Sequence, residues 1–362
     1  MENTRTHWDE KKSKVIVLKE FMKKAYIYPI SGRDKTGVHN PYVDNFVKSF
    51  SKYFDFVNVE HPSYSGILDI RKYAGKIDFV FFHWIENVVD RKGGYLQMMF
   101  LFSMFYYFKL KGIKTVWTVH NKISHEGTNY KLKGRLIKFL LKNCDYLIVH
   151  AKEGLDFIKE FSGKENLKVI FRHHPVTKEF VPAKSDKVID ILIWGRISPY
   201  KGIDKFLELL YDKQLESRFR ILIIGKASDE SYGEKLMKYQ NAGIKIINRF
   251  AEDEELKRLA MTSRIILFPY QSSSVLGSGV LMDSIVYEAD ILGPEKGAFA
   301  DLANENLIYS YNDYNEMIDR IDGILKTGKS IDADKRKKFI DENSWEKYAG
   351  FIMSRIESFN KS

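Results

Sequence analysis

Short apolar runs alternate with amphipathic stretches along most of this 362-residue chain. Val188 to Ile193 is one such run, and the stretch Ile203 to Tyr211 that follows it repeats its apolar residues at helical spacing. This alternation of strand and helix implies an α/β fold with parallel sheets and crossover helices. The predicted strands lie at 25–30, 56–60, 79–84, 115–120, 146–150 and 168–171 in the first half, and at 188–193, 220–224, 244–247, 265–268 and 290–292 in the second.

A polar segment interrupts this alternation near the middle of the chain. Few apolar residues occur between Val176 and Lys187, and Pro175 and Pro182 lie in or next to this stretch. The chain is also longer than a single typical core requires. We therefore predict two Rossmann-like domains, one over residues 1–175 and one over residues 188–343.

The charge balance and the cysteine count narrow the possible functions. The formal charge of +10 favours a polyanionic partner: an anionic lipid surface, a nucleotide or a nucleic acid. No RNA-binding or DNA-binding motif is present, so a nucleic acid ranks last. Cys144 is the single cysteine, and no Asp, His and Cys set has ligand spacing, so we expect no metal site. The N-terminus lacks the apolar core of a signal peptide, which favours the cytoplasm.

One apolar run differs from the predicted strands. Tyr95 to Leu110 contains a single charge, Lys109, and is too short to span a bilayer. We expect a helix buried between the sheet and its neighbours. The alternative is a helix that partly faces lipid.

The most distinctive segment is WGRISPYKG, from Trp194 to Gly202. It joins a predicted strand to a predicted helix, with Gly195 in the turn and the cations Arg196 and Lys201 projecting from it. Backbone amides at a helix N-terminus together with two cations suit a diphosphate. The alternative for an isolated segment is a solvated basic loop.

A second candidate anion site lies in QSSSVLGSGVLMDSI, from Gln271 to Ile285. Ser278 is placed to cap a helix that begins near Gly279, whose first amides would face a phosphate. Asp283 follows about one turn later, within reach of ribose hydroxyls. The alternative is a Ser/Gly-rich loop that caps a structural helix.

The order of these elements resembles the nucleotide-binding domain of GT-B glycosyltransferases, in particular the retaining family 4. The resemblance covers about Val188 to Phe299 and implies two Rossmann-like domains that face a cleft, with the final helix, residues 345–359, packed back on the first domain. It also implies a nucleotide-diphosphate sugar of the UDP or GDP type as co-substrate, with no metal or other cofactor. The donor-binding residues that it implies are Gly195, Arg196, Lys201, Phe250 near the nucleobase, Ser278, Gly279, Val280 and Asp283.

The first half holds the candidates for the chemical step. Strand ends at FFHWIEN and VWTVHN place Glu86 and His120 at the carboxyl edge where open α/β sheets bind ligands, and Glu126 follows on the next loop. In the family that the chain resembles, a His at the position of His120 faces the donor sugar. Glu86, His120 and Glu126 are also the candidates for a general base. The alternative is that these side chains only pack strand ends or cap a helix.

The chain departs from the family pattern at one position. The family carries two Glu residues separated by seven others, and aligning Asp283 with the second puts Val275 in place of the first. The resemblance predicts a retaining, hexosyl-type glycosyltransferase of the EC 2.4 class that builds capsule or exopolysaccharide on a glycan or lipid-linked acceptor. The alternative is a non-enzymatic relative that binds a sugar nucleotide or glycan. A basic cluster in the first half favours a peripheral position on the inner leaflet of the plasma membrane, although a solvated helix face explains it equally: Lys131, Lys133, Arg135 and Lys138.

Overall fold

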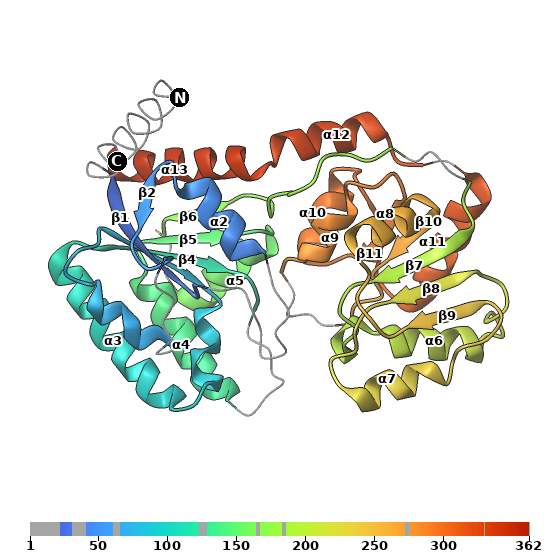
Figure 1. Cartoon of the computed structure of the whole chain (residues 1–362), viewed down its shortest axis with the longest axis horizontal. Coiled ribbons are helices and arrows are strands. Elements are labelled where there is room, and N and C mark those ends of the chain that lie inside the picture. Colours follow the sequence, from blue (N-terminus) through green and yellow to red (C-terminus); the bar gives the residue numbers. More distant parts are fainter. Residues whose placement is uncertain are drawn as a thin grey trace, which may run out of the picture. The chain divides into compact units, whose positions relative to one another are not determined.

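The chain forms two compact units, each with one six-stranded parallel sheet (Figure 1). Unit 1 contains the chain up to Val149, Leu155–Phe171 and the segment from Trp345 onward, and unit 2 contains His150–Gly154 and Arg172–Ser344. The computed structural model describes residues 22–30, 41–60, 66–122, 129–163, 167–182, 186–271, 276–328 and 330–361.

The strands of unit 1 follow the order β2-β1-β3-β4-β5-β6. This order is the flavodoxin-like variant of the doubly wound fold. The strands are β1 (Lys23–Tyr28), β2 (Phe54–Phe56), β3 (Phe79–His83), β4 (Lys114–Val119), β5 (Tyr146–Val149) and β6 (Val169–Phe171). The helices are α2 (Tyr42–Phe50), η1 (Gly66–Lys72), η2 (Ile85–Asp90), α3 (Gly94–Lys111), α4 (Tyr130–Asn143), α5 (Glu153–Ser162) and α13 (Trp345–Lys361), of which η1 and η2 are 3-10 helices.

Both faces of the unit 1 sheet are covered, which explains why its strands are continuous apolar runs. Alternate side chains point to opposite faces. Phe81 points to the face that α2 and α13 cover, where its ring centroid is 5.3 Å from that of Phe46 on α2. Phe82 points to the other face and stacks on Phe105 of α3, with centroids 5.6 Å apart.

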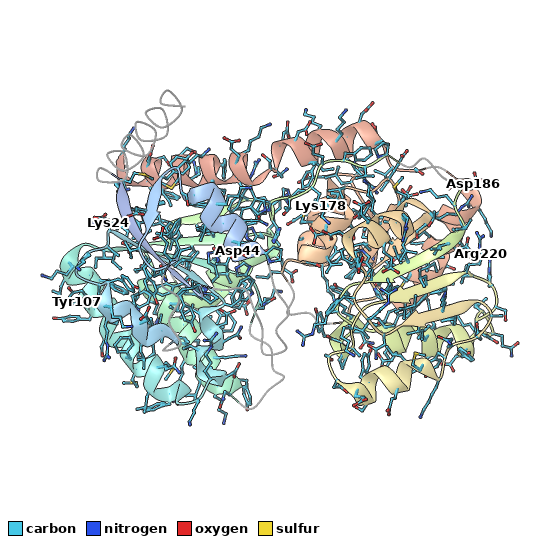
Figure 2. The ribbon with its side chains drawn as sticks, viewed as in Figure 1. Lys24, Asp44, Tyr107, Lys178, Asp186 and Arg220 are labelled. Atoms are coloured by element: carbon cyan, nitrogen blue, oxygen red, sulfur yellow. The ribbon has the colours of Figure 1, made fainter. Side chains whose placement is uncertain are left out.

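The helix α3 is apolar on its outer side as well (Figure 2, where Tyr107 of this helix is labelled). Met98, Leu101 and Phe108 are buried, but Leu96 is 71% exposed and Tyr106 is 70% exposed. The helix expected to be buried between the sheet and its neighbours is therefore buried on one side only, among the described residues. One face packs on the sheet, and α4 covers only part of the rest. No helix in the described ranges is long and apolar enough to cross a membrane.

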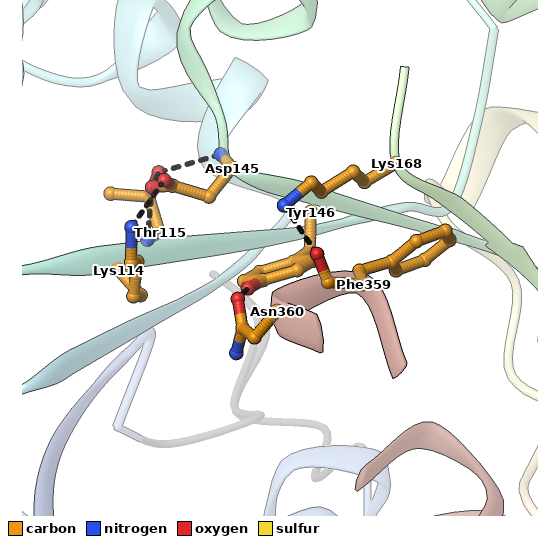
Figure 3. A network of polar contacts seen from close by, with 7 residues as sticks. All are labelled: Lys114, Thr115, Asp145, Tyr146, Lys168, Phe359 and Asn360. Atoms are coloured by element: carbon orange, nitrogen blue, oxygen red, sulfur yellow. Dashed lines mark hydrogen bonds and ion pairs between the residues drawn. The ribbon is translucent and has the colours of Figure 1, made fainter. Parts of the chain in front are cut away.

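The C-terminal helix α13 completes the core of unit 1, and Figure 3 shows the polar contacts at its last turn. Tyr348 is buried and its ring lies 6.2 Å from that of Phe50. At the other end of α13, the Tyr146 hydroxyl donates a hydrogen bond to Asn360, and the Lys168 amine donates one to the Phe359 carbonyl at 3.0 Å. The last helix is thus tied to β5 and to the residue that precedes β6.

The strands of unit 2 follow the order β12-β11-β10-β7-β8-β9, which is the Rossmann order. The strands are β7 (Ile189–Trp194), β8 (Ile221–Ile224), β9 (Ile244–Ile247), β10 (Ser263–Leu267), β11 (Asp290–Pro294) and β12 (Tyr309–Tyr311). The helices are η3 (Pro199–Lys201), α6 (Ile203–Asp212), α7 (Glu230–Met237), α8 (Asp253–Met261), α9 (Gly279–Ser284), α10 (Gly297–Asn304), α11 (Tyr314–Thr327) and α12 (Ala333–Glu342).

A buried arginine fixes α12 within unit 2. The Arg336 guanidinium donates to the carbonyls of Leu307 and Tyr287, both at 3.0 Å, and to that of Ala289 at 2.7 Å. Burial lowers the pKa of Arg336. The carbonyls nevertheless satisfy most of its donors, and this allows a charge to remain inside the fold.

The strand orders locate one reversal point in each sheet. In unit 2 the chain starts at β7 and proceeds to β8 on one side and later to β10 on the other. In unit 1 the corresponding point lies between β1 and β3. Open α/β sheets bind ligands beyond the carboxyl ends of the strands at such points. The predicted fold class, α/β with two Rossmann-like domains, is confirmed, whereas the cleft between them stays a prediction.

Candidate functional site

The loop after β7 brings a glycine and a lysine together at the reversal point of unit 2. Gly195 has φ +91°, a conformation that side chains rarely adopt. A Cβ built on Gly195 would lie 3.3 Å from Nζ of Lys201 and 3.2 Å from a methyl group of Val280. The loop after β7 and the start of α9 therefore converge, and these are the two segments that the family resemblance assigns to the donor diphosphate.

The amine of Lys201 lies in an unusual environment for a cation. The residue is only 3% exposed, and its Nζ lies 5.6 Å from the centroid of the Tyr270 ring. Burial, with a smaller contribution from the nearby positive charge of Arg196, lowers the pKa of Lys201 to about 7. No carboxylate of the described residues forms an ion pair with this amine. Its site therefore favours a bound anion, which would compensate for the desolvated charge.

The start of α9 forms the other side of this site. Ser278 is the N-cap of α9, and its hydroxyl accepts a hydrogen bond from the Leu281 amide at 3.2 Å. Ser278 has a lowering effect on the pKa of the buried Tyr270 hydroxyl, smaller than the raising effect of burial. Gly279 is exposed and a Cβ at this position would meet nothing within 4 Å. The first amides of the helix are groups that need an external partner.

Asp283 lies on α9, one turn beyond its start. Burial raises the pKa of Asp283 to about 6, and the positive charge of Lys178 opposes this shift. The Lys178 amine is itself paired with Asp253 at 3.0 Å. A half-buried carboxyl group next to a phosphate site can accept hydrogen bonds from ribose hydroxyls, which is the predicted role.

Phe250 lies in the loop after β9 and is 41% exposed. The preceding Arg249 forms two hydrogen bonds with Glu255, at 2.7 and 2.8 Å, and donates to the Phe250 carbonyl at 3.1 Å. The loop is thus fixed while the ring stays accessible. An accessible aromatic ring on a fixed loop is suited to stacking on a nucleobase.

The carboxyl edge of the unit 1 sheet holds a cluster of aromatic and imidazole rings. Nδ1 of His83, at the end of β3, lies 3.3 Å from Nε2 of His120, which follows β4. The Trp84 ring stacks on His120 with centroids 4.1 Å apart, and the Tyr42 ring meets His120 edge-on at 4.8 Å. Burial lowers the pKa of His83 to about 3, so this imidazole is neutral. His120 is therefore held in one orientation by three neighbours.

Glu86 lies in η2 at the same edge and is buried. Burial raises the pKa of Glu86 to about 7, against the smaller lowering effects of hydrogen bonds and of Lys133. Within the described ranges its Oε2 atom has no hydrogen-bond partner. A carboxyl group with a pKa near neutrality suits proton transfer, although a buried position also suits a structural role.

The structure brings one set of predicted residues together in unit 2 and places His120 and Glu86 at the sheet edge of unit 1. Gly195, Lys201, Ser278, Gly279 and Val280 come together in unit 2, with Arg196 in the same loop. His120 and Glu86 belong to unit 1. Glu126 and Val275 lie outside the described residues.

Sequence reasoning missed two residues that complete these clusters. Tyr42 contacts His83, His120 and Trp84, and Tyr270 lies under the Lys201 amine. Tyr42 begins the helix after the first loop, and Tyr270 follows β10. Their positions beyond strands at the reversal points are the signal that could have identified them.

Together the two sheets and their order define the GT-B fold of glycosyltransferases. Solved structures of similar fold include GT-B glycosyltransferases. HepE from Anabaena, in complex with UDP and glucose, matches with a TM-score of 0.69 over 93% of this chain and 100% of its own, at 11% identity. A glycosyltransferase from Rickettsia africae matches with a TM-score of 0.57 over 94% of this chain and 98% of its own, at 14% identity.

A third similar structure is AviGT4, a glycosyltransferase involved in avilamycin A biosynthesis. It matches with a TM-score of 0.55 over 93% of this chain and 98% of its own, at 10% identity. No family model and no curated protein sequence matches the chain. At these identities the comparisons establish the fold.

Proposed function

We propose that this chain is a glycosyltransferase that transfers a hexosyl group from a nucleotide-diphosphate sugar of the UDP or GDP type. The observation that carries the proposal is the convergence of Gly195, the buried Lys201 amine and the start of α9 at the reversal point of unit 2. The GT-B fold and the structures of HepE with UDP and with UDP-glucose support it. Arg196 and Lys201 would bind the diphosphate, Asp283 the ribose and Phe250 the nucleobase.

We propose retention of configuration for the chemical step. The bond between the anomeric carbon and the diphosphate oxygen breaks, the acceptor oxygen bonds to that carbon on the same face, and the acceptor proton passes to the leaving diphosphate. Arg196 and Lys201 would stabilise the charge that develops on this leaving group, so the proposal needs no metal or other cofactor. His120 would orient the donor sugar, held in place by His83 and Trp84.

Inversion would require a protein base in place of the diphosphate. Glu86 is a candidate among the described residues, because burial raises its pKa to about 7. Glu126 is the other candidate from the sequence. The anomeric configuration of the product, determined by NMR, separates the two mechanisms: an inverted product would rule out retention.

The acceptor that we propose is a glycan or a lipid-linked sugar, in the synthesis of capsule or exopolysaccharide at the inner leaflet. The basic residues of α4 support this position: Lys131, Lys133, Arg135 and Lys138. A second function has one supporting observation. Val275 occupies the position at which the resembled family carries a Glu, which favours a chain that binds sugar nucleotides without transfer.

A thermal-shift screen against UDP, GDP, ADP and their sugar conjugates tests nucleotide binding. A ligand that binds only the folded chain stabilises it by about 2.7 kcal/mol at a hundredfold excess over Kd. Arg196→Ala and Lys201→Ala should each weaken binding by roughly 1.5–3 kcal/mol. Lys213→Ala, which removes a surface cation after α6, is the control. Unchanged affinity in both site variants would rule out this site, and binding without transfer would favour the second function.

A further inference from the structure

The outer side of α3 carries a row of exposed apolar residues. Leu96, Met99, Tyr106 and Leu110 follow spacings of three, seven and four residues, so they lie along one line on the helix surface, in which the exposed Ser103 bonds to the Met99 carbonyl at 3.2 Å and is the polar member. Their exposed fractions run from 43% for Met99 to 71% for Leu96. We call these four residues the α3 stripe. With a rise of about 1.5 Å per residue, the stripe is roughly 20 Å long.

Such a row is unusual on a surface that faces only water. A surface helix normally places polar residues on its outer face, and a helix that is apolar all round is normally buried. A continuous exposed apolar patch marks a surface that contacts another apolar phase or a partner. Lys109 and Lys111 are the charged residues of α3, and both lie in its last turn.

Basic residues predominate on α3 and on its neighbour α4, where Lys133 is already paired with Asp90 at 2.6 Å. The helix α4 packs beside α3, with the Phe102 and Phe139 rings 4.0 Å apart (Figure 1). Neither helix contains an acidic residue, whereas the two carry seven basic residues. These are Lys109, Lys111, Lys131, Lys133, Arg135, Lys138 and Lys142.

The basic residues are not confined to one end of the stripe. Lys109 of α3 and Lys142 of α4 line the same small cavity next to Leu110, together with Lys114 and Asp145, which pair with each other at 3.4 Å. Arg91 and Lys92 are exposed just before α3 begins, near Leu96 in the sequence. Cations thus lie near both ends of the apolar row.

We infer that the α3 stripe and its basic border dock unit 1 on a bilayer that contains anionic lipid. A helix that lies in the membrane interface combines an apolar face with flanking Lys and Arg, and Tyr is favoured at headgroup level. The apolar residues would enter the acyl boundary while the cations meet lipid phosphates. A protein partner would need a strongly acidic surface around an apolar groove. The bilayer supplies both chemistries in one plane, so charge and apolarity together favour lipid.

The experiment is flotation of the full chain with vesicles. Vesicles of phosphatidylcholine with phosphatidylglycerol should bind the chain, and vesicles of phosphatidylcholine alone should bind it much more weakly. The triple variant Leu96→Gln, Tyr106→Gln, Leu110→Gln should lower binding at least about tenfold, because it removes apolar contacts with the acyl boundary. These side chains are mostly exposed, so the fold should tolerate the change. The matched control is Val188→Gln with Met237→Gln, two exposed apolar residues of unit 2.

The basic border is tested separately. Lys109→Gln with Lys142→Gln should reduce binding by roughly fivefold for each charge, and added salt should reduce binding of the unmodified chain. Lys335→Gln with Lys337→Gln on α12 removes the same charge from unit 2 and serves as the control.

Three results would overturn the inference. The first is failure of the unmodified chain to bind anionic vesicles, and the second is binding of the stripe variant as strong as that of the unmodified chain. The third is a chain that self-associates in buffer and does not bind vesicles, when the stripe variant no longer self-associates. The stripe would then be an interface between copies. The assay uses no nucleotide, so it is independent of the proposed transfer. Vesicle binding without nucleotide binding would refute the transferase proposal and leave this inference intact. Nucleotide binding without vesicle binding would refute this inference and leave the transferase proposal intact.

Discussion

Replacing Lys201 with arginine should separate the charge of this residue from its titration. Burial lowers the pKa of Lys201 to about 7, so half of the empty sites carry a charged amine at pH 7 and about 3% at pH 8.5. If the donor diphosphate binds only the charged form, the apparent Kd is the intrinsic Kd divided by the charged fraction. The apparent Kd should therefore rise about fifteenfold between pH 7 and pH 8.5.

Two variants isolate the cause of this slope. Lys201→Arg keeps the charge throughout this range, because a guanidinium does not lose its proton in proteins. Its Kd should therefore stay constant with pH. Lys201→Met has no charge and should bind weakly at every pH. Isothermal titration calorimetry with UDP-glucose measures these values, and both phosphates of this ligand are esterified, so they do not titrate here.

The same shift affects the stability of unit 2. A lysine whose pKa is lowered in the folded chain binds fewer protons there than in the unfolded chain between about pH 7 and 10.5. Stability from this group therefore rises with pH across that window. Below pH 7 the folded chain bears the full free-energy cost of burying the charged amine, at most about 5 kcal/mol.

Two binding results would refute the reasoning. One is a Kd of the unmodified chain that does not change with pH, and the other is a pH dependence of Kd that persists in Lys201→Arg.

Three further predictions follow from buried or constrained residues. Gly202→Ala should lower the Tm strongly, because Gly202 has φ +65° and its new Cβ would lie 2.2 Å from the Pro269 carbonyl oxygen. The control is Gly328→Ala, which has a similar φ of +59° but open space around it and should cost only about 1 kcal/mol of stability. Glu86→Gln should raise the free energy of unfolding by up to about 3 kcal/mol at pH 8 and leave it unchanged at pH 4, as measured by denaturant unfolding. The reason is that the raised pKa of about 7 makes the stability of the unmodified chain fall as pH rises from about 4.5 to 7. His120→Ala should lower kcat far more than it weakens nucleotide binding in calorimetry, and equal losses in both would contradict a role in the transition state.

The periodicity of the sequence predicted most of the fold because a parallel strand buried on both faces is a short apolar run. The strand β12 was not predicted, since Tyr309–Tyr311 is only three residues long and two of them are half-buried. Periodicity also failed for α3. A helix that is apolar all round indicates burial, and sequence alone does not reveal that one side is exposed among the residues that the structure describes.

The candidate sites were predictable in position but not in environment. The loop from Trp194 to Gly202 could be recognised because turn, cations and helix start are contiguous. The burial of Lys201 depends on Tyr270, which is 69 residues away in the chain. Likewise, the contact between His83 and His120 joins two strands, and only the register of β3 against β4 creates it.

The return of α13 to unit 1 has a consequence for the order in which the chain matures on the ribosome. Domains generally fold as they emerge, the N-terminal one first. Here the apolar side of α13 that covers the first sheet, with Tyr348, Ile352 and Ile356 buried, emerges only after all of unit 2. The unit that begins synthesis first is therefore completed last. Until then its phenylalanine-rich sheet face lacks part of its cover, and nascent chains should be most prone to chaperone capture during that interval.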